Sequence, residues 1–135
     1  MLDADMFGEG AELDHIGLAV RSIDRTPHKG LQSTHDPEQR VNVAFIKVHG
    51  TTVELIEPAA EDDPISASLE RGTKLVHLCF RVPEIDRAID AAREWGFRCV
   101  RKPVPGSAFE NRLIAWLFSD VYGLVELVQA PASSR

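Results

Sequence analysis

The same phrase occurs twice in this chain, and the repeat restricts the folds that the chain can adopt. Residues 13–24 and residues 75–86 both match L-x-H-[IL]-x-[LF]-x-V-x-x-I-D, which places His15 and His77 at an offset of 62 residues (77 − 15). A second pair of phrases, VELI and VELV, places a glutamate in each half at an offset of 72 residues (126 − 54). A duplicated module folded about a pseudo-two-fold axis would bring two histidines and two glutamates together.

These four residues have the chemistry of a metal site. Side chains alternate between the two faces of a strand, so His15 shares its face with the small residues Gly17 and Ala19. A carboxylate in the middle of a strand is costly to bury unless it is paired or ligating, and two of them repel each other without a cation between them. Solvated glutamates and ordinary strand histidines are the alternative, but the pairwise match between the halves favours the metal site. Zinc, iron, nickel, cobalt and manganese all suit two imidazoles and two carboxylates.

Both halves follow one plan, which predicts an α+β fold of paired βαβββ modules. The clearest helix covers residues 83–95, where apolar side chains recur every three or four positions and Gly96 supplies a stop. Its predicted buried face consists of Ile85, Ala88, Ile89, Ala92 and Trp95. The offset between the halves changes from 62 to 72 between Asp24 and Arg40, and Pro27 breaks a helix in this gap. The helix of the first module is therefore expected to be shortened or missing.

The repeat also predicts where the modules begin and end. We expect a disordered tail over residues 1–11, a helix-depleted first module over 12–58, a linker over 59–73, a second module over 74–130 and a tail over 131–135.

The composition excludes several classes of protein. A net charge of −6 without a basic stripe argues against a nucleic-acid partner. No run of 18 apolar residues is present, so we expect no membrane span. The first ten residues lack the pattern of a signal peptide, and two cysteines are too few for a disulfide framework. We therefore expect a cytoplasmic protein with a small-molecule substrate.

The motifs resemble those of the vicinal oxygen chelate superfamily, which includes glyoxalase I, extradiol dioxygenases, methylmalonyl-CoA epimerase and bleomycin-resistance proteins. The strand phrases LDHIGLAV, VELIEP, LVHLCFRV and GLVELVQ carry the likeness, in an order most similar to methylmalonyl-CoA epimerase-like members, over roughly residues 13–129. The resemblance implies a cupped mixed sheet around one central divalent metal ion. It implies that the metal ligands are His15, Glu54, His77 and Glu126. The chain departs from the epimerases in its shortened first helix and in Val76, where they usually carry another histidine.

The resemblance further implies an enzyme that removes a proton next to a carbonyl or thioester through a metal-stabilised enolate. Glu126 is the first candidate for the acid–base role, and Glu54 faces it from the other module. Gln39, Arg81 and Arg112 are the candidates for binding a carboxylate or phosphate group of the substrate, and a solvated cation at a strand edge is the alternative for each arginine. A homodimer is expected. The alternatives are a lactoylglutathione lyase of the glyoxalase I type, a metal-free resistance-type binding protein, and a dioxygenase, whose family uses two histidines and one carboxylate.

Overall fold

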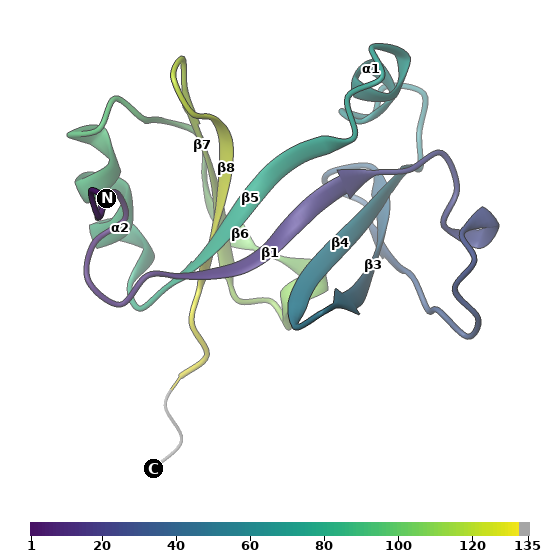
Figure 1. Ribbon diagram of the computed structural model, residues 1–135, viewed down its shortest axis with the longest axis horizontal. Coiled ribbons are helices and arrows are strands. Elements are labelled where there is room, and N and C mark those ends of the chain that lie inside the picture. The colour runs from purple at the N-terminus through teal and green to yellow at the C-terminus, as the bar shows by residue number, and fades with distance from the viewer. Residues whose placement is uncertain (133–135) are drawn as a thin grey trace. The chain divides into compact units, whose positions relative to one another are not determined.

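Residues 1–132 are described by the structure, a computed structural model, and they form eight strands with two short α-helices (Figure 1). The chain divides into two compact units. The first unit comprises residues 15–77, and the second comprises residues 1–14 together with the chain from residue 78 onward. Part of the predicted tail 131–135 lies outside the described residues.

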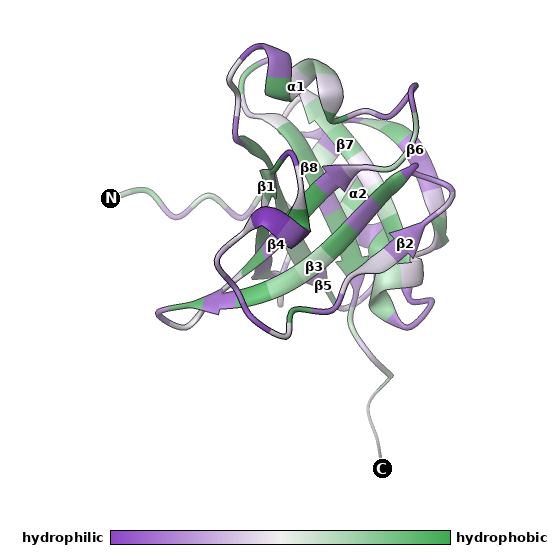
Figure 2. Ribbon diagram, turned by 90° about the vertical axis from the view of Figure 1, so that its right-hand side faces the viewer, coloured by the Kyte–Doolittle hydropathy of each residue, from purple (hydrophilic) through white to green (hydrophobic). Residues whose placement is uncertain are grey.

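The first unit contains four strands in the order β2-β3-β4-β1. They are β1 (Glu12–Ala19, whose first three residues belong to the second unit), β2 (Thr34–Asp36), β3 (Val41–Val48) and β4 (Thr51–Pro58). β1 runs parallel to β4, and the other pairs are antiparallel. Figure 2 shows β3 as hydrophobic along most of its length. His49 and Gly50 join β3 to β4 with φ angles of 48° and 86°, as a two-residue hairpin turn of the primed type requires.

A single 3₁₀ turn stands where the first module would carry its helix. This turn, η1 (Ile23–Arg25), follows β1, and the chain then passes Pro27 without further helix before β2. Ile23 packs into a core with Ala44, Val53 and Leu55 of β3 and β4. The predicted loss of the first helix is therefore confirmed, and the apolar side chain of η1 covers part of the sheet face that a helix would cover.

The linker between the modules contains a short helix, α1 (Ser66–Glu70). Asp63 begins it by accepting hydrogen bonds from the backbone N–H groups of Ile65 (2.7 Å) and Ser66 (2.8 Å) and from the Ser66 hydroxyl (2.6 Å). Burial raises the pKa of Asp63, but the Ser66 and Ile65 hydrogen bonds outweigh it, and the pKa lies below its ordinary value of 3.8.

The second unit keeps the complete module. Its elements are β5 (Leu75–Val82, whose first three residues belong to the first unit), α2 (Ile85–Arg93), β6 (Arg98–Pro105), the turn η2 (Ser107–Phe109), β7 (Leu113–Ser119) and β8 (Gly123–Gln129). The strand order is β5-β8-β7-β6, with β5 and β8 parallel and the other pairs antiparallel. α2 packs against β6, β7 and β8 (Figure 1).

α2 begins where the Glu84 side chain accepts the N–H groups of Asp86 and Arg87. Four of the five predicted helix positions are buried, namely Ile85, Ala88, Ile89 and Ala92. The fifth is wrong, because α2 ends at Arg93 and Trp95 is 37% exposed in the turn that follows. Gly96, with a φ of 89°, ends this turn as predicted.

β6 keeps pairing with β7 as far as Pro105, across register shifts. One further expectation needs correction in the second unit. Phe7, in the stretch expected to be a loose tail, is 5% exposed and packs in the core beside α2. Its ring centroid lies 4.9 Å from that of Phe80 and 5.4 Å from that of Phe97.

The structure confirms the predicted class, a mixed sheet of repeated strand modules with few and short helices. The predicted module boundaries stay predictions. Among the described residues, no helix has the length and apolar character that crossing a membrane requires.

Candidate metal centre

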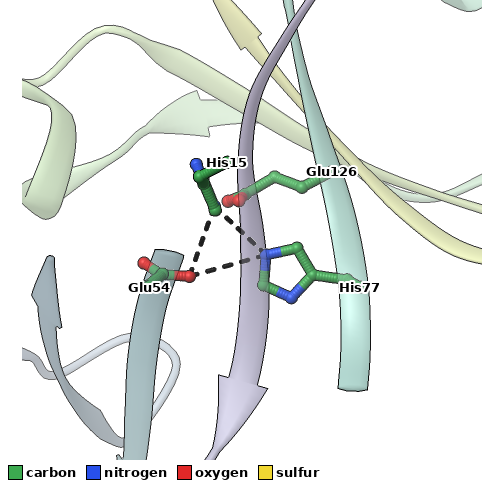
Figure 3. Close-up of side chains that lie close together, drawn as sticks. All are labelled: His15, Glu54, His77 and Glu126. Carbon is green, nitrogen blue, oxygen red and sulfur yellow. Dashed lines mark hydrogen bonds and ion pairs between the residues drawn. The ribbon is translucent and has the colours of Figure 1, made fainter. Parts of the chain in front are cut away.

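Three of the four predicted ligands meet inside the first unit. The Nε2 atoms of His15 and His77 lie 3.3 Å apart. Oε1 of Glu54 lies 3.4 Å from the first of these atoms and 3.5 Å from the second. Figure 3 shows the three side chains pointing toward one another from β1, β4 and β5. All three are buried, with exposed fractions of 0% for His15 and 5% for both Glu54 and His77.

The strand register explains why these side chains converge. Gly17 of β1 lies opposite Glu54 of the parallel strand β4. The backbone N–H of Ala19 donates to the carbonyl of Lys74 (2.7 Å), which ties the end of β1 to the residue before β5. His15, two residues from Gly17, and His77, three residues from Lys74, therefore project near the same carboxylate.

Neighbouring side chains fix both imidazole rings. The ring of His77 occupies the space above Gly17, where a Cβ atom would overlap it. The rings of His15 and Phe45 pack edge to face, with centroids 5.5 Å apart and planes at 79°. Phe45 lies opposite Glu54 in the β3–β4 pair. Phe45 could not be assigned to the site from the sequence, because packing in the core explains an aromatic residue in a strand equally well.

The donor set fits a divalent metal ion. A tetrahedral ion with bonds of about 2.0–2.1 Å to nitrogen and carboxylate oxygen holds its ligand atoms roughly 3.3–3.4 Å apart. The distances of 3.3, 3.4 and 3.5 Å within this cluster are close to that value. Two imidazoles and a carboxylate are borderline ligands that suit zinc and its first-row neighbours. The His15, Glu54 and His77 side chains can therefore hold such an ion and leave coordination positions for other ligands.

The fourth predicted ligand, Glu126, belongs to β8 of the second unit. It is 2% exposed, and its register partners are Cys79 of β5 and Trp116 of β7. A carboxylate buried this deeply in a strand requires compensation by a positive or hydrogen-bonding partner. The role of Glu126 as a metal ligand stays a prediction, which is based on the sequence repeat.

Arg81, one of the candidate substrate residues, has ion-pair partners of its own. Its guanidinium donates to Asp14 (3.1 Å) and to Glu12 (2.8 Å), both at the start of β1. These pairs give Arg81 a structural role in the second unit.

The other two candidate substrate residues, Arg112 and Gln39, also form hydrogen bonds within the protein. Arg112 donates to the carbonyl groups of Gln129 (2.9 Å) and Phe109 (3.2 Å), and Gln39 donates to the Asp36 carboxylate (3.1 Å). Each of these three side chains already has an intramolecular partner. Contacts of Arg81, Arg112 and Gln39 with a substrate stay predictions.

Comparisons with known proteins agree with this geometry. Residues 14–116 match the model of the Glyoxalase/Bleomycin resistance protein/Dioxygenase superfamily, a segment that includes His15, Glu54 and His77. The ethylmalonyl-CoA/methylmalonyl-CoA epimerase of Cereibacter sphaeroides is 33% identical over 129 residues, which cover 87% of this chain and 96% of that enzyme. The crystal structure of methylmalonyl-CoA epimerase from Mycobacterium tuberculosis aligns with a TM-score of 0.74 and 25% identity, over 97% of this chain and 94% of that one.

A shorter part of the chain has a higher sequence identity to another protein. Over 77 residues the chain is 43% identical to the uncharacterized protein YqjC of Bacillus subtilis. The aligned residues cover 50% of this chain and 55% of that protein. The chain thus spans about half the length of that relative.

Proposed function

Because the chain belongs to the Glyoxalase/Bleomycin resistance protein/Dioxygenase superfamily, we propose that it is a metal-dependent epimerase acting next to a carbonyl or thioester. The observation that carries the proposal is the buried triangle of ligand atoms from His15, Glu54 and His77, with edges of 3.3–3.5 Å. The relationship to methylmalonyl-CoA epimerases supports the reaction type.

In this proposal one divalent ion binds to His15, Glu54 and His77, and Glu126 is the fourth ligand. The repeat supports the fourth position, since Glu126 occupies in the second module the place of Glu54 in the first. A bound divalent ion supplies Lewis acidity, which stabilises negative charge developing on a substrate oxygen. Loss of these ligands would be expected in a metal-free binding protein, so their retention weighs against that alternative.

The acid–base chemistry is assigned to the two glutamates. An epimerase needs one group to accept the proton next to the carbonyl and another to return a proton on the opposite face. Glu126 and Glu54 are carboxylates from different modules, and both are buried, at 2% and 5% exposed.

A thioester of coenzyme A is the proposed substrate class, because epimerase relatives that match most of this chain are named for such substrates. The lyase alternative shares the same ligand set, so the reaction type has to be separated by experiment. The homodimer remains a prediction, which light scattering on the purified protein checks.

The first experiment measures the metal content of the purified protein and its His77→Ala variant. We expect one divalent ion per chain in the unmodified protein and a loss of about 10-fold or more in metal affinity for the variant. The second experiment follows deuterium exchange next to the thioester of methylmalonyl-CoA and ethylmalonyl-CoA. Exchange that depends on metal and on Glu126 supports the epimerase. Metal binding without exchange, together with turnover of a glutathione hemithioacetal, contradicts it in favour of the lyase.

A further inference from the structure

A row of residues across three neighbouring strands of the first unit surrounds the His15 imidazole. Glu54 of β4 lies opposite Phe45 of β3 on one side and opposite Gly17 of β1 on the other. The row therefore has an aromatic ring at one end, a carboxylate in the middle and no side chain at the other end. Over Gly17, the His77 ring occupies the space that a side chain would take.

The His15 ring is perpendicular to both of its aromatic neighbours. Its plane makes an angle of 79° with the Phe45 ring and of 85° with the His77 ring, at centroid distances of 5.5 and 5.4 Å. Such pairs attract because the positive edge of one ring meets the negative face of the other. His77 is itself a predicted ligand, whereas Phe45 comes from β3, which carries none of the four predicted ligands. We propose that Phe45 is a positioning residue of the metal centre and holds the His15 imidazole in its ligating orientation.

The orientation of His15 decides whether the ligand atoms converge. Its Nε2 atom lies 3.3 Å from Nε2 of His77 and 3.4 Å from Oε1 of Glu54. Rotation of the imidazole about its side-chain bonds would carry Nε2 away from both atoms. A ligand whose rotamer is already fixed by packing loses less conformational freedom when the ion binds. Phe45 thus raises metal affinity through His15 without offering an atom to the ion, an inference that rests on the metal site of the proposed function.

The Phe45 ring also limits the access of water to the cluster. Phe45 is half-buried, whereas His15 and Glu54 beside it are 0% and 5% exposed. The apolar shell around a metal site controls solvent access and the local dielectric constant. A smaller side chain at position 45 therefore opens a path to the ion for water and for chelators, and the ion leaves faster.

The test compares two variants of Phe45 with a control on the opposite face of β3. Phe45→Leu keeps an apolar side chain but removes the ring, and Phe45→Ala also opens the shell. Ile46, the next residue, is half-buried as well, but it packs against the core that contains Ala44 and Leu55. Because side chains alternate along a strand, Ile46→Ala removes a large apolar group from β3 without touching the cluster.

Three measurements on the full chain separate positioning from general stability. Competition with a chelating dye gives the zinc affinity, excess chelator gives the rate of zinc release, and the visible spectrum of the cobalt-loaded protein reports coordination geometry. We expect zinc affinity to fall by about tenfold in Phe45→Leu and by about 10- to 100-fold in Phe45→Ala, with faster release and an altered cobalt spectrum. Ile46→Ala should lower the thermal midpoint but keep the zinc affinity, the release rate and the cobalt spectrum.

Unchanged zinc affinity and an unchanged cobalt spectrum in the Phe45 variants would overturn the positioning role. An equal loss in Ile46→Ala would also overturn it, because the effect would then come from a loosened β3. If Phe45→Ala does not fold, Phe45→Leu decides the question. A failure of the epimerase proposal looks different: zinc binding that depends on Phe45, without deuterium exchange in the substrates, supports the positioning role and removes the reaction. Absence of metal binding by the unmodified protein would overturn the metal centre and this role with it.

Discussion

Gly17 lies so close to the imidazole of His77 that any side chain at position 17 would overlap the ring. A Cβ atom there would lie closer to Cε1, Nδ1 and Nε2 of His77 than van der Waals contact allows. Gly17 itself needs no unusual backbone angle, since it is not among the residues with positive φ. Position 17 therefore requires glycine because no space is left for a side chain. The absence of a side chain there allows His77, a predicted metal ligand, to keep its orientation.

We expect Gly17→Ala to lower metal affinity by about 10- to 100-fold. This is the effect typical of changing a residue that positions a metal ligand without binding the metal itself. The added methyl group must push the His77 ring away from its 3.3 Å contact with His15. Metal titration followed by an indicator dye gives the dissociation constant, and circular dichroism checks the fold.

The matched control is Gly30→Ala, which adds a methyl group in open space at a φ of 73°. It carries a backbone penalty of about 1 kcal/mol without touching the cluster. We expect it to lower stability and keep the metal affinity. Unchanged metal binding by Gly17→Ala would show that the His77 ring can move without loss of ligation.

The repeat alone predicted much of this site. The offsets placed His15, His77 and Glu54 on matching strands, and strand alternation gave them a common face. The sequence could not show which ring fills the space above Gly17, because that depends on how the ends of β1 and β5 pair. The sequence predicts small residues beside His15, but it does not show which side chain lies against them.

Metal ions should stabilise the folded protein. Binding to the folded state alone contributes RT ln(1 + [L]/Kd), which is about 2.7 kcal/mol at a free metal concentration of 100 times the dissociation constant. Thermal unfolding in the presence of zinc, nickel, cobalt or manganese should therefore show a midpoint several degrees above that of the chelated protein. His77→Ala should lose most of this response. An equal rise in that variant would locate the stabilising ion away from the His15–Glu54–His77 cluster.

Asp63 should give the linker helix a pH-dependent stability. Its folded pKa lies below the ordinary value of 3.8, so its contribution is present above that pH and is lost as the pH falls through the folded pKa. Asp63→Ala removes the cap of α1 and should lower the free energy of unfolding by about 0.5–2 kcal/mol at neutral pH. Urea unfolding across the acidic range should show this difference shrinking below pH 3.8. Glu61→Gln, which changes an exposed acid in the same segment, should leave both values unchanged.

Phe7 makes the amino-terminal segment part of the core of the second unit. Its side chain is 5% exposed and contacts the rings of Phe80 and Phe97, so truncation removes a large apolar group and leaves a cavity. Phe7→Ala should lower the free energy of unfolding by about 3–5 kcal/mol. Leu2, five residues earlier and 83% exposed, supplies the control, and Leu2→Ala should stay within about 0.5 kcal/mol. Urea unfolding separates the two outcomes. A loss below about 1 kcal/mol for Phe7→Ala would mean that the segment detaches at little cost, as a disordered tail over residues 1–11 requires.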